Sequence, residues 1–199
     1  MDGGRGSLPG RVVLASASPR RRELLETAGF ELIVRPAGVD ELTGSLAPRD
    51  LVAANARLKA LDVAASFPDD IVLGADTVVV LDGEILGKPR DMDHAAEMLG
   101  RLSGRVHEVL TGVCLTRGGD LCLFVESTRV SFRSLDHSAI ASYLAEIDPL
   151  DKAGAYAAQE DRGRLIAHLE GSLENVIGLP VARVIEALRR HFGIRQPDG

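Results

Sequence analysis

The sequence predicts an α/β fold with a mixed β-sheet, and three observations support this prediction. Strand-like apolar segments alternate with segments of helical spacing along the 199 residues. The turns Asp82-Gly83 and Gly118-Gly119 each separate two strand-like segments, which is typical of antiparallel hairpins and excludes a purely parallel sheet. Hydrophobic residues make up 45% of the chain, with few aromatics and no Trp, so the core must be mostly aliphatic.

Four elements and a hairpin are expected in the first half of the chain. In order, they are a strand at 11–15, a helix from 19 to about 29, a short strand at 31–35, a helix from 48 to about 66, and a hairpin of 71–81 with 84–86. Ser18 and Pro19 supply the N-cap and the first residue of the first helix. The second helix is predicted by apolar residues at helical spacing, namely Leu51, Ala54, Leu58, Leu61 and Val63.

The second half continues the alternation. In order, it contains a helix at 93–102, two long strands at 106–115 and 121–132, a helix at 136–147, a strand at 164–169 and a helix at 180–192. The last helix begins at Pro180 and carries basic residues in its final turn, where the helix dipole favours them. No repeat or low-complexity linker interrupts the pattern. We therefore expect one domain over residues 11–192, between tails at 1–10 and 193–199.

Composition excludes several classes of protein. The net charge of −6 argues against a sequence-independent grip on nucleic acid or on an anionic membrane. No apolar run approaches the ~18 residues of a membrane span, and residues 1–10 lack the apolar segment of a signal peptide. Cys114 and Cys122 lack metal-ligand spacing, which favours buried thiols in a reduced cytoplasm. The GxSxG, HExxH and GxxxxGK[ST] motifs are absent.

Arg20, Arg21 and Arg22 fall in the first turn of the first helix, where acidic residues are usually favoured. Together with the free backbone amides and the helix dipole, these guanidinium groups would hold a phosphate or a carboxylate. A surface helix with solvated arginines is the alternative interpretation. Because the protein is acidic, any anionic ligand must be met by a local cationic pocket.

Asp76 places one carboxylate inside the apolar run 71–81. A buried charge is costly unless it is paired, bound to a metal or located at a strand end that faces a cleft. We expect a bulge that exposes Asp76, which suits a general base or a ligand of a divalent metal. An aspartate in a turn is the alternative. Lys59, on the second helix, and Lys88, on the loop after the hairpin, each fit a solvated surface when taken alone.

Two further segments contain polar groups that could bind a ligand. His107 and Glu108 fall on opposite faces of a strand and cannot form a simple dyad, so we favour a His107 that is hydrogen-bonded between lobes. The run 151–159 is small and pliant around Tyr156, which permits close approach of a ligand. The amide of Gln159 could pair with the edge of a nucleobase, although a tight core crossing is the alternative.

Taken together and in order, these segments resemble the Maf family of nucleoside triphosphate pyrophosphatases over about residues 11–190. The residues that carry the resemblance are Ser16-Ala17-Ser18-Pro19-Arg20-Arg21, Val39-Asp40-Glu41, Lys59-Ala60, Gly74-Ala75-Asp76-Thr77-Val78-Val79, Gly87-Lys88-Pro89, Leu102-Ser103-Gly104 with His107, Thr111-Gly112-Val113, the run Asp151–Gln159, and Asn175-Val176-Ile177-Gly178-Leu179-Pro180. Each motif alone is weak, but all nine in register are highly specific.

The resemblance implies two α/β lobes around a long mixed sheet with flanking helices, similar to inosine triphosphate pyrophosphatases, with the active site between the lobes. It also implies hydrolysis of a nucleoside triphosphate to the monophosphate and pyrophosphate, with Mg²⁺ or Mn²⁺, by a homodimer. The run from Asp151 to Tyr156, followed by Gln159, is similar to the branch that acts on dTTP and UTP. The branch that acts on 7-methyl-GTP carries Ser-Phe-Lys and a Glu in this run.

Site residues follow by position from the same resemblance. The expected catalytic residues are Asp76, Lys88 and Glu41, and the expected substrate-binding residues are Ser18, Arg20, Arg21, Lys59, Thr77 and Gln159. Asp76 is the proton acceptor, and it would share the metal with Glu41. Arg20, Thr77 and Gln159 occupy the positions at which the family discriminates its substrates.

Two departures leave alternatives open. Gln159 is followed by Glu160-Asp161-Arg162 before Gly163, where the family usually has Gly at once, and position 173 is Leu where an aromatic is frequent. The added acidity makes the preference among pyrimidines less secure, so the same chemistry on modified purines or CTP is one alternative. A non-catalytic, nucleotide- or nucleic-acid-binding regulator of septum formation is the other. A pure binder gains nothing from a buried general base, which argues against the regulator.

Overall fold

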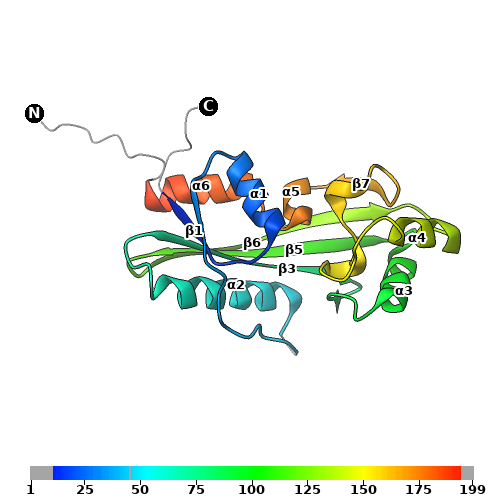
Figure 1. Cartoon of the computed structure of the whole chain (residues 1–199), viewed down its shortest axis with the longest axis horizontal. Helices are drawn as coiled ribbons and strands as arrows, with labels where there is room; N and C mark the ends of the chain where they lie inside the picture. Colours follow the sequence, from blue (N-terminus) through cyan, green and yellow to red (C-terminus); the bar gives the residue numbers. More distant parts are fainter. Residues whose placement is uncertain (1–10, 45, 194–199) are drawn as a thin grey trace, which may run out of the picture.

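A computed structural model describes residues 11–44 and 46–193 of the chain (Figure 1). The predicted α/β architecture with a mixed sheet is confirmed, because seven strands form one sheet that is flanked by helices. The tail expected at 1–10 lies outside the described residues, as does the C-terminal tail except for Gly193.

Every predicted helix and strand is present, with ends that differ by a few residues. In chain order, the elements are β1 Val12–Leu14, α1 Pro19–Thr27, β2 Leu32–Val34, α2 Pro48–Ala64, β3 Ile71–Leu81, β4 Glu84–Leu86, α3 Met92–Leu102, β5 Val106–Arg117, β6 Asp120–Phe132, α4 His137–Leu144, the 3₁₀ turns η1 Ala153–Ala155 and η2 Ala158–Glu160, β7 Ile166–Glu170, α5 Leu173–Ile177 and α6 Val181–Phe192. Helix α5 is absent from the elements predicted above, because five residues are too few to display a helical period.

The order of the strands leaves a gap along one edge of β3. The sheet order is β2-β1-β3-β5-β6-β7, with β4 also paired to β3. On the edge of β3 away from β5, β1 pairs in parallel with residues 71–73 and β4 pairs antiparallel with residues 79–81. Within the described residues, no strand pairs with residues 74–78 on this edge. We call this segment the open edge of β3, and it contains Asp76.

The bulge expected at Asp76 is wrong. β3 pairs with β5 without a register shift from Val72 to Val80, and Asp76 lies directly opposite Gly112. The strand needs no distortion, because the open edge already brings residues 74–78 to a free margin of the sheet. Side chains from both faces of β3 can therefore reach the same space, even though Asp76 and Thr77 alternate across the strand.

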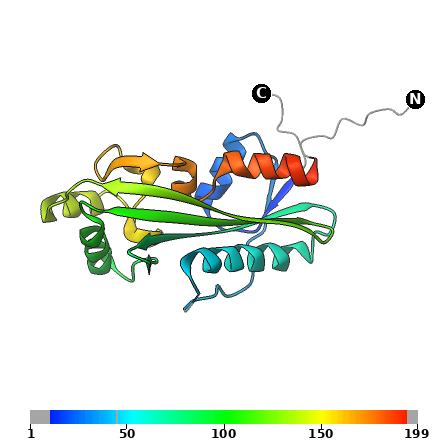
Figure 2. The same ribbon diagram turned by 180° about the vertical axis from the view of Figure 1, so that it is seen from behind.

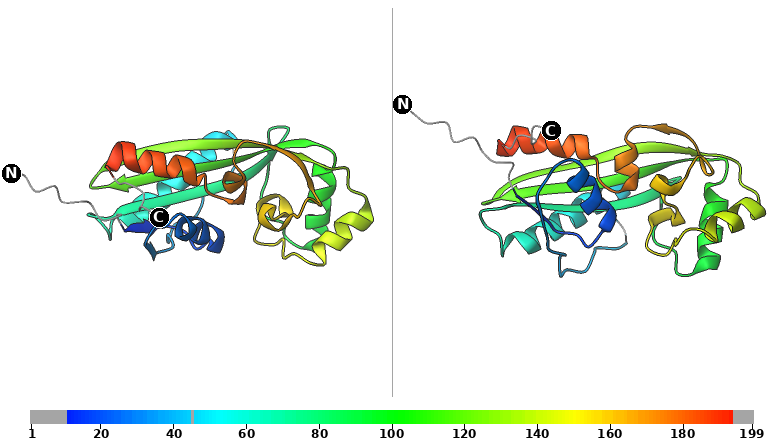
Figure 3. Two further views of the ribbon diagram at one scale, coloured as in Figure 1. Left: turned by 90° about the horizontal axis from the view of Figure 1, so that it is seen from above. Right: turned by 45° about the horizontal axis from the view of Figure 1, so that its top comes forward.

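Two lobes lie at opposite ends of the long strands β3, β5 and β6 (Figures 1 and 3). In the first lobe, α2 covers one face of the sheet, and α1, α5 and α6 cover the other (Figure 2). The second lobe contains β4, α3, α4, β7 and the two 3₁₀ turns. Each lobe has its own core, with Leu25, Leu73 and Leu188 buried in the first and Leu99, Leu102 and Tyr143 buried in the second.

Helix α2 lies unusually close to the sheet. A Cβ atom added at Gly74 would stand 2.3 Å from the carbonyl oxygen of Ala56, and one added at Gly112 would stand 2.3 Å from that of Val52. The apolar face predicted for α2 is partly wrong, because Leu61 is exposed and Asn55 is buried. The contact with the two glycines turns the small-residue side of the helix inward. It also brings Asn55 and Lys59 against the open edge of β3.

Candidate active site

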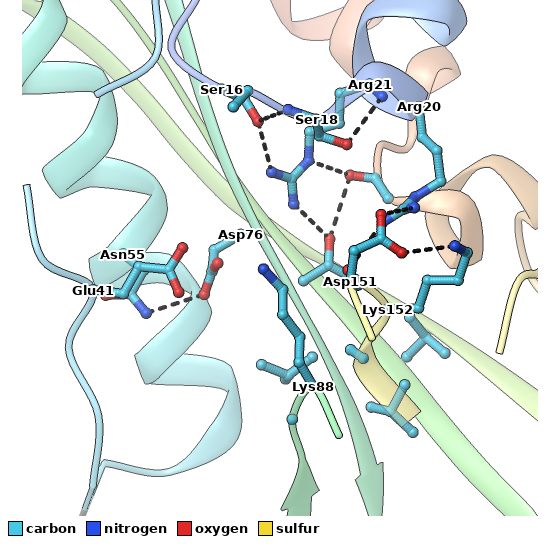
Figure 4. Close-up of a pocket in the computed structure, with 18 of the residues that line it drawn as sticks. Ser16, Ser18, Arg20, Arg21, Glu41, Asn55, Asp76, Lys88, Asp151 and Lys152 are labelled. Atoms are coloured by element: carbon cyan, nitrogen blue, oxygen red, sulfur yellow. Dashed lines mark hydrogen bonds and ion pairs between the residues drawn. The ribbon is translucent and has the colours of Figure 1, made fainter. Parts of the chain in front are cut away.

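A cleft of about 770 Å³ opens along the open edge of β3 and is lined by residues of both lobes (Figure 4). The structure brings every residue predicted for the site into its lining, namely Ser18, Arg20, Arg21, Glu41, Lys59, Asp76, Thr77, Lys88 and Gln159. They come from the β1–α1 loop, the first turn of α1, the 39–44 loop, α2, β3, the loop after β4 and the 151–159 run. Residues that are far apart in sequence therefore converge on one site.

Asp76 is nearly buried, with 7% of its surface exposed, and both of its carboxylate oxygens accept hydrogen bonds. Lys59 Nζ donates to Oδ1 at 2.9 Å, and Asn55 Nδ2 donates to Oδ2 at 3.1 Å. Both donors come from α2, one helical turn apart. Because each of these groups donates, they stabilise Asp76 as a carboxylate that accepts hydrogen bonds.

Asn55 is a site residue that the sequence reasoning missed. Besides its bond to Asp76, its Nδ2 donates to the carbonyl oxygen of Leu42 at 3.2 Å, and its Oδ1 accepts from the Leu42 amide at 2.7 Å. One buried amide thus connects Asp76 to the loop that carries Glu41. A polar residue between the buried Val52 and Ala56 of α2 was the signal that could have revealed it.

Glu41 and Asp76 both approach one ammonium group. Lys59 Nζ lies 2.5 Å from Glu41 Oε1 and 2.9 Å from Asp76 Oδ1. Partial burial alone would raise the pKa of the Glu41 carboxyl, but its hydrogen bond to Lys59 and the charges of Lys59, Lys88 and Arg21 hold that pKa below its ordinary value. These groups therefore favour the ionised form of Glu41 beside Asp76.

Two adjacent acidic side chains, Glu41 and Asp76, fit a Mg²⁺ or Mn²⁺ ion that completes its shell with water and phosphate oxygens. They do not form an all-protein metal cage. Among residues 11–44 and 46–193, no group of three or more His, Cys, Asp or Glu side chains is placed to hold an ion. The donor set is therefore compatible with a metal that arrives together with a phosphate ligand.

Arg21 is braced by three segments of the first lobe. Its Nη1 donates to Ser16 Oγ at 3.1 Å, its Nη2 to Thr77 Oγ1 at 3.0 Å, and its Nε to the carbonyl oxygen of Gly178 at 2.9 Å. Burial lowers the pKa of the guanidinium, and the charge of Asp76 partly opposes this effect. Ser18 caps α1 as predicted, accepting from the Arg21 amide at 3.5 Å.

Arg20 reaches across the cleft to the second lobe. Its Nη1 donates to Asp151 Oδ2 at 2.9 Å, while Lys152 Nζ donates to Asp151 Oδ1 at 2.6 Å (Figure 4). The third arginine of the cluster does not join them, contrary to expectation. Arg22 is exposed, pairs with Glu26 one turn along α1 at 3.5 Å, and does not line the cleft.

Lys88 and Gln159 lie on the side of the cleft formed by the second lobe. The Lys88 side chain extends between Asp76 and Asp151 (Figure 4), and within the described residues it forms no hydrogen bond or ion pair. Gln159 is exposed, and its Nε2 donates weakly to Glu160 at 3.5 Å. Asp161 instead turns inward and accepts from the backbone amides of residues 163, 165 and 166, so only Glu160 adds acidity beside Gln159.

His107 and the two cysteines do not line the cleft. His107 is buried, its Nε2 lies 2.9 Å from the hydroxyl of Tyr156, and burial lowers its pKa to about 4. The predicted hydrogen bond is therefore confirmed, but the predicted place between the lobes is wrong, because His107 packs against Phe132 and Tyr156 of the second-lobe core. Cys114 and Cys122 are free thiols on neighbouring strands, and burial raises the pKa of Cys114 to about 12.

Residues 11–191 match the protein family described as Maf-like protein. This chain belongs to the Maf-like family. Curated relatives named dTTP/UTP pyrophosphatase include one from Anaeromyxobacter dehalogenans, 51% identical over 90% of this chain and 93% of its own. Those from Symbiobacterium thermophilum and Pyrococcus abyssi are 47% and 42% identical, over 92% and 91% of this chain and 94% and 96% of theirs.

Two solved structures that align with this Maf-like chain have lower sequence identity to it. The Staphylococcus aureus Ham1 protein aligns with a TM-score of 0.46 at 17% identity, over 61% of this chain and 71% of its own. A nucleoside-triphosphatase described as a dITP/XTP pyrophosphatase from Mycobacterium abscessus aligns with a TM-score of 0.45 at 15% identity, over 92% of this chain and 96% of its own.

No described helix of this Maf-like protein is both long and apolar enough to cross a membrane.

Proposed function

We propose that this Maf-like protein hydrolyses dTTP and UTP to the nucleoside monophosphate and pyrophosphate. The observation that carries the proposal is Asp76, a carboxylate at the open edge of β3 whose two oxygens accept from Lys59 and Asn55 beside a cationic cleft. Relatives that share 42–51% of their sequence with this chain and bear the name dTTP/UTP pyrophosphatase support the choice of substrate.

In the proposed reaction, Asp76 orients a water molecule and accepts its proton as the water oxygen bonds to the α-phosphorus. The bond from that phosphorus to the pyrophosphate oxygen breaks in line, and pyrophosphate leaves with the electron pair. Lys88, which has no competing partner among the described residues, stabilises the charge of the leaving group. Arg20 and Arg21 bind the triphosphate from the side of α1, where Ser18 caps the helix.

Glu41 and Asp76 would hold the divalent cation. When bound, such an ion neutralises phosphate oxygens and lowers the pKa of a coordinated water. Lys59, which contacts both carboxylates, keeps the pair of negative charges together in the absence of the ion. The homodimer implied by the family resemblance also remains a prediction, and sedimentation of the purified protein would test it.

The base would be read at the rim formed by Gln159. Its exposed amide offers both donors and an acceptor to the edge of a pyrimidine. Glu160, which lies beside Gln159, could accept from the amino group of cytosine, so CTP is the specific competitor to include. Thr77 acts in this proposal through Arg21, because its hydroxyl already contacts Arg21 and Gly178.

The test is to measure pyrophosphate and orthophosphate separately, with Mg²⁺ or Mn²⁺ and a panel of nucleoside triphosphates. We expect pyrophosphate from dTTP and UTP, little from purines, and none after chelation of the metal. Asp76→Asn should reduce turnover by at least about 10²–10³-fold, because it removes the proton acceptor and one negative charge from the centre of the site.

Several outcomes would change the conclusion. Release of pyrophosphate from CTP or modified purines would keep the chemistry and overturn the proposed base preference. Wild-type turnover by a folded Asp76→Asn variant would remove Asp76 from its role. Binding of nucleotides without turnover of any of them would favour the non-catalytic regulator.

A further inference from the structure

Three hydrogen bonds to the protein orient the guanidinium of Arg21 and leave two of its N–H groups free to bind a ligand. A guanidinium has five N–H donors, and Ser16, Thr77 and Gly178 accept three of them. Two donors remain for an anion in the cleft, one on each terminal nitrogen. Because the group is planar and rigid, the three protein bonds fix the directions in which these two donors point.

The direction of the Thr77 hydroxyl depends on the groups that contact it. Its hydroxyl accepts from Arg21 Nη2, and the same oxygen lies 3.0 Å from Thr111 Oγ1 and 3.3 Å from the Gly178 carbonyl oxygen. Thr111 lies directly opposite Thr77 in the register of β5 with β3. The two hydroxyls thus form a cross-strand pair on the face away from α2.

Thr111 is completely buried and does not line the cleft. Its hydroxyl donates to the backbone carbonyl oxygen of Asn175 in α5 at 3.2 Å. The Asn175 side chain is itself fixed, since its Nδ2 donates to Val109 O and Thr128 Oγ1, both at 3.0 Å. A continuous series of hydrogen bonds therefore runs from α5 through Thr111 and Thr77 to Arg21.

We propose that Thr111 is a positioning residue that orients Arg21 for the phosphate chain through the hydroxyl of Thr77. The inference rests on the proposed function only for the identity of the ligand. Thr111 touches no ligand and takes part in no bond change. If Thr111 lacks its hydroxyl, the Thr77 hydroxyl can turn toward the Gly178 carbonyl oxygen alone. Arg21 Nη2 then loses an acceptor of fixed position.

The experiment compares Thr111→Val, which keeps the branched shape, with Thr111→Ser, which keeps the hydroxyl. Binding of inorganic tripolyphosphate is measured by calorimetry in the presence of a chelator, and KM and kcat are measured with dTTP. We expect Thr111→Val to weaken tripolyphosphate binding about tenfold and to raise KM more than it lowers kcat. Thr111→Ser should recover wild-type affinity to within about twofold.

Thr116 provides a matched control on the same strand. It is equally buried, and its hydroxyl donates to the carbonyl oxygen of Asp120 at 2.7 Å, far along β5 from the cleft. Thr116→Val should therefore leave tripolyphosphate binding and KM unchanged. Thr111→Ala, which also lacks the hydroxyl, supplies the test if Thr111→Val does not fold.

The proposal is overturned if folded Thr111→Val binds tripolyphosphate as the wild type does. It is also overturned if Thr111→Ser is as impaired as Thr111→Val, or if Thr116→Val is impaired to the same extent. If the wild-type protein binds tripolyphosphate but hydrolyses no nucleotide, the proposed function is wrong. The tripolyphosphate affinities of the Thr111 variants would still decide the role of Thr111.

Discussion

Two buried titratable side chains, Asp76 and His107, meet the cost of burial in different ways. Both oxygens of Asp76 accept hydrogen bonds, one from an ammonium and one from an amide. His107 stays neutral, because burial lowers its pKa to about 4 and its one hydrogen-bond partner among residues 11–44 and 46–193 is the neutral hydroxyl of Tyr156. The first arrangement preserves a reactive group, whereas the second makes stability depend on pH.

The expected pH dependence follows from the direction of the His107 shift. Between pH 6.5 and about 4, the unfolded chain binds this proton and the folded chain does not, so the free energy of unfolding falls as the pH falls. Above pH 6.5 the effect is absent. In His107→Phe this contribution disappears, and urea titrations should show that the variant loses about 2 kcal/mol less than wild type between pH 7 and 5.

The control for this prediction is His168→Gln, which alters an exposed histidine on β7 and should retain the wild-type dependence. Parallel curves for His107→Phe and wild type would contradict the assignment of a neutral, buried His107. An offset that is added to the predicted difference in slope would not contradict it, because loss of the bond to Tyr156 has the same cost at every pH in this range.

At the scale of single elements, α2 is the part of the fold that assembles the site. It supplies Asn55 and Lys59, which reach Asp76 because Gly74 and Gly112 let the helix backbone approach the sheet. The position of the helix therefore sets both the packing of the first lobe and the hydrogen bonds of the carboxylate.

Gly112→Ala should separate α2 from the sheet. The added methyl group would meet the carbonyl oxygen of Val52 at 2.3 Å, and a backbone atom cannot rotate away. We expect the free energy of unfolding in urea to fall by about 3 kcal/mol, and turnover to fall because Lys59 and Asn55 move with the helix.

Gly100→Ala is the matched control. Gly100 lies in α3, is exposed, and has no atom within 4 Å of the added methyl position. This variant should be more stable than the wild type by about 0.5–1 kcal/mol, with unchanged turnover. If Gly112→Ala is as stable as the wild type, the close approach of α2 does not constrain this helix.

The elements were predictable where periodicity and turn residues agree, and the site was predictable where its residues form motifs. The hairpin at Asp82-Gly83 and the cap at Ser18 are examples. Asn55 escaped notice because its partners, Leu42 and Asp76, are distant in sequence and their contacts depend on how α2 packs. Arg22 was wrongly grouped with its neighbours, because a step of about 100° around the helix turns it away from the cleft.

At the scale of the whole molecule, an acidic protein concentrates positive charge where the strands are unpaired. The net charge is −6, yet the described residues that line the cleft include five cationic and three anionic side chains. Most of these charges are paired with one another, and the Arg20–Asp151 pair joins the two lobes across the cleft. A triphosphate must therefore compete with Asp151 for Arg20.

Asp151→Asn should favour the ligand in this competition. Because the Arg20 pair is exposed and asparagine keeps an acceptor oxygen for Lys152, the free energy of unfolding should change by about 1 kcal/mol. Removing a negative charge that faces the phosphate chain should lower KM for dTTP by about twofold to fivefold, and the effect should shrink with added salt.

Glu146→Gln serves as the control, since it breaks an exposed pair with Arg164 that does not line the cleft. It should leave KM unchanged at every salt concentration. A KM that rises in Asp151→Asn would show that Asp151 holds Arg20 ready for the ligand and does not compete for it.

The open edge of β3 also has a mechanical consequence. β1 ends at Leu14 on one side of the gap and β4 ends at Leu86 on the other, so of the described strands only β3, β5 and β6 run from one lobe to the other. A change in the twist of this three-stranded ribbon would widen or narrow the cleft and would leave the strand–strand hydrogen bonds in place. Only the Arg20–Asp151 pair spans the mouth from lobe to lobe as a direct ion pair between described residues. The twist of the sheet would therefore set the distance between the two lobes across the cleft.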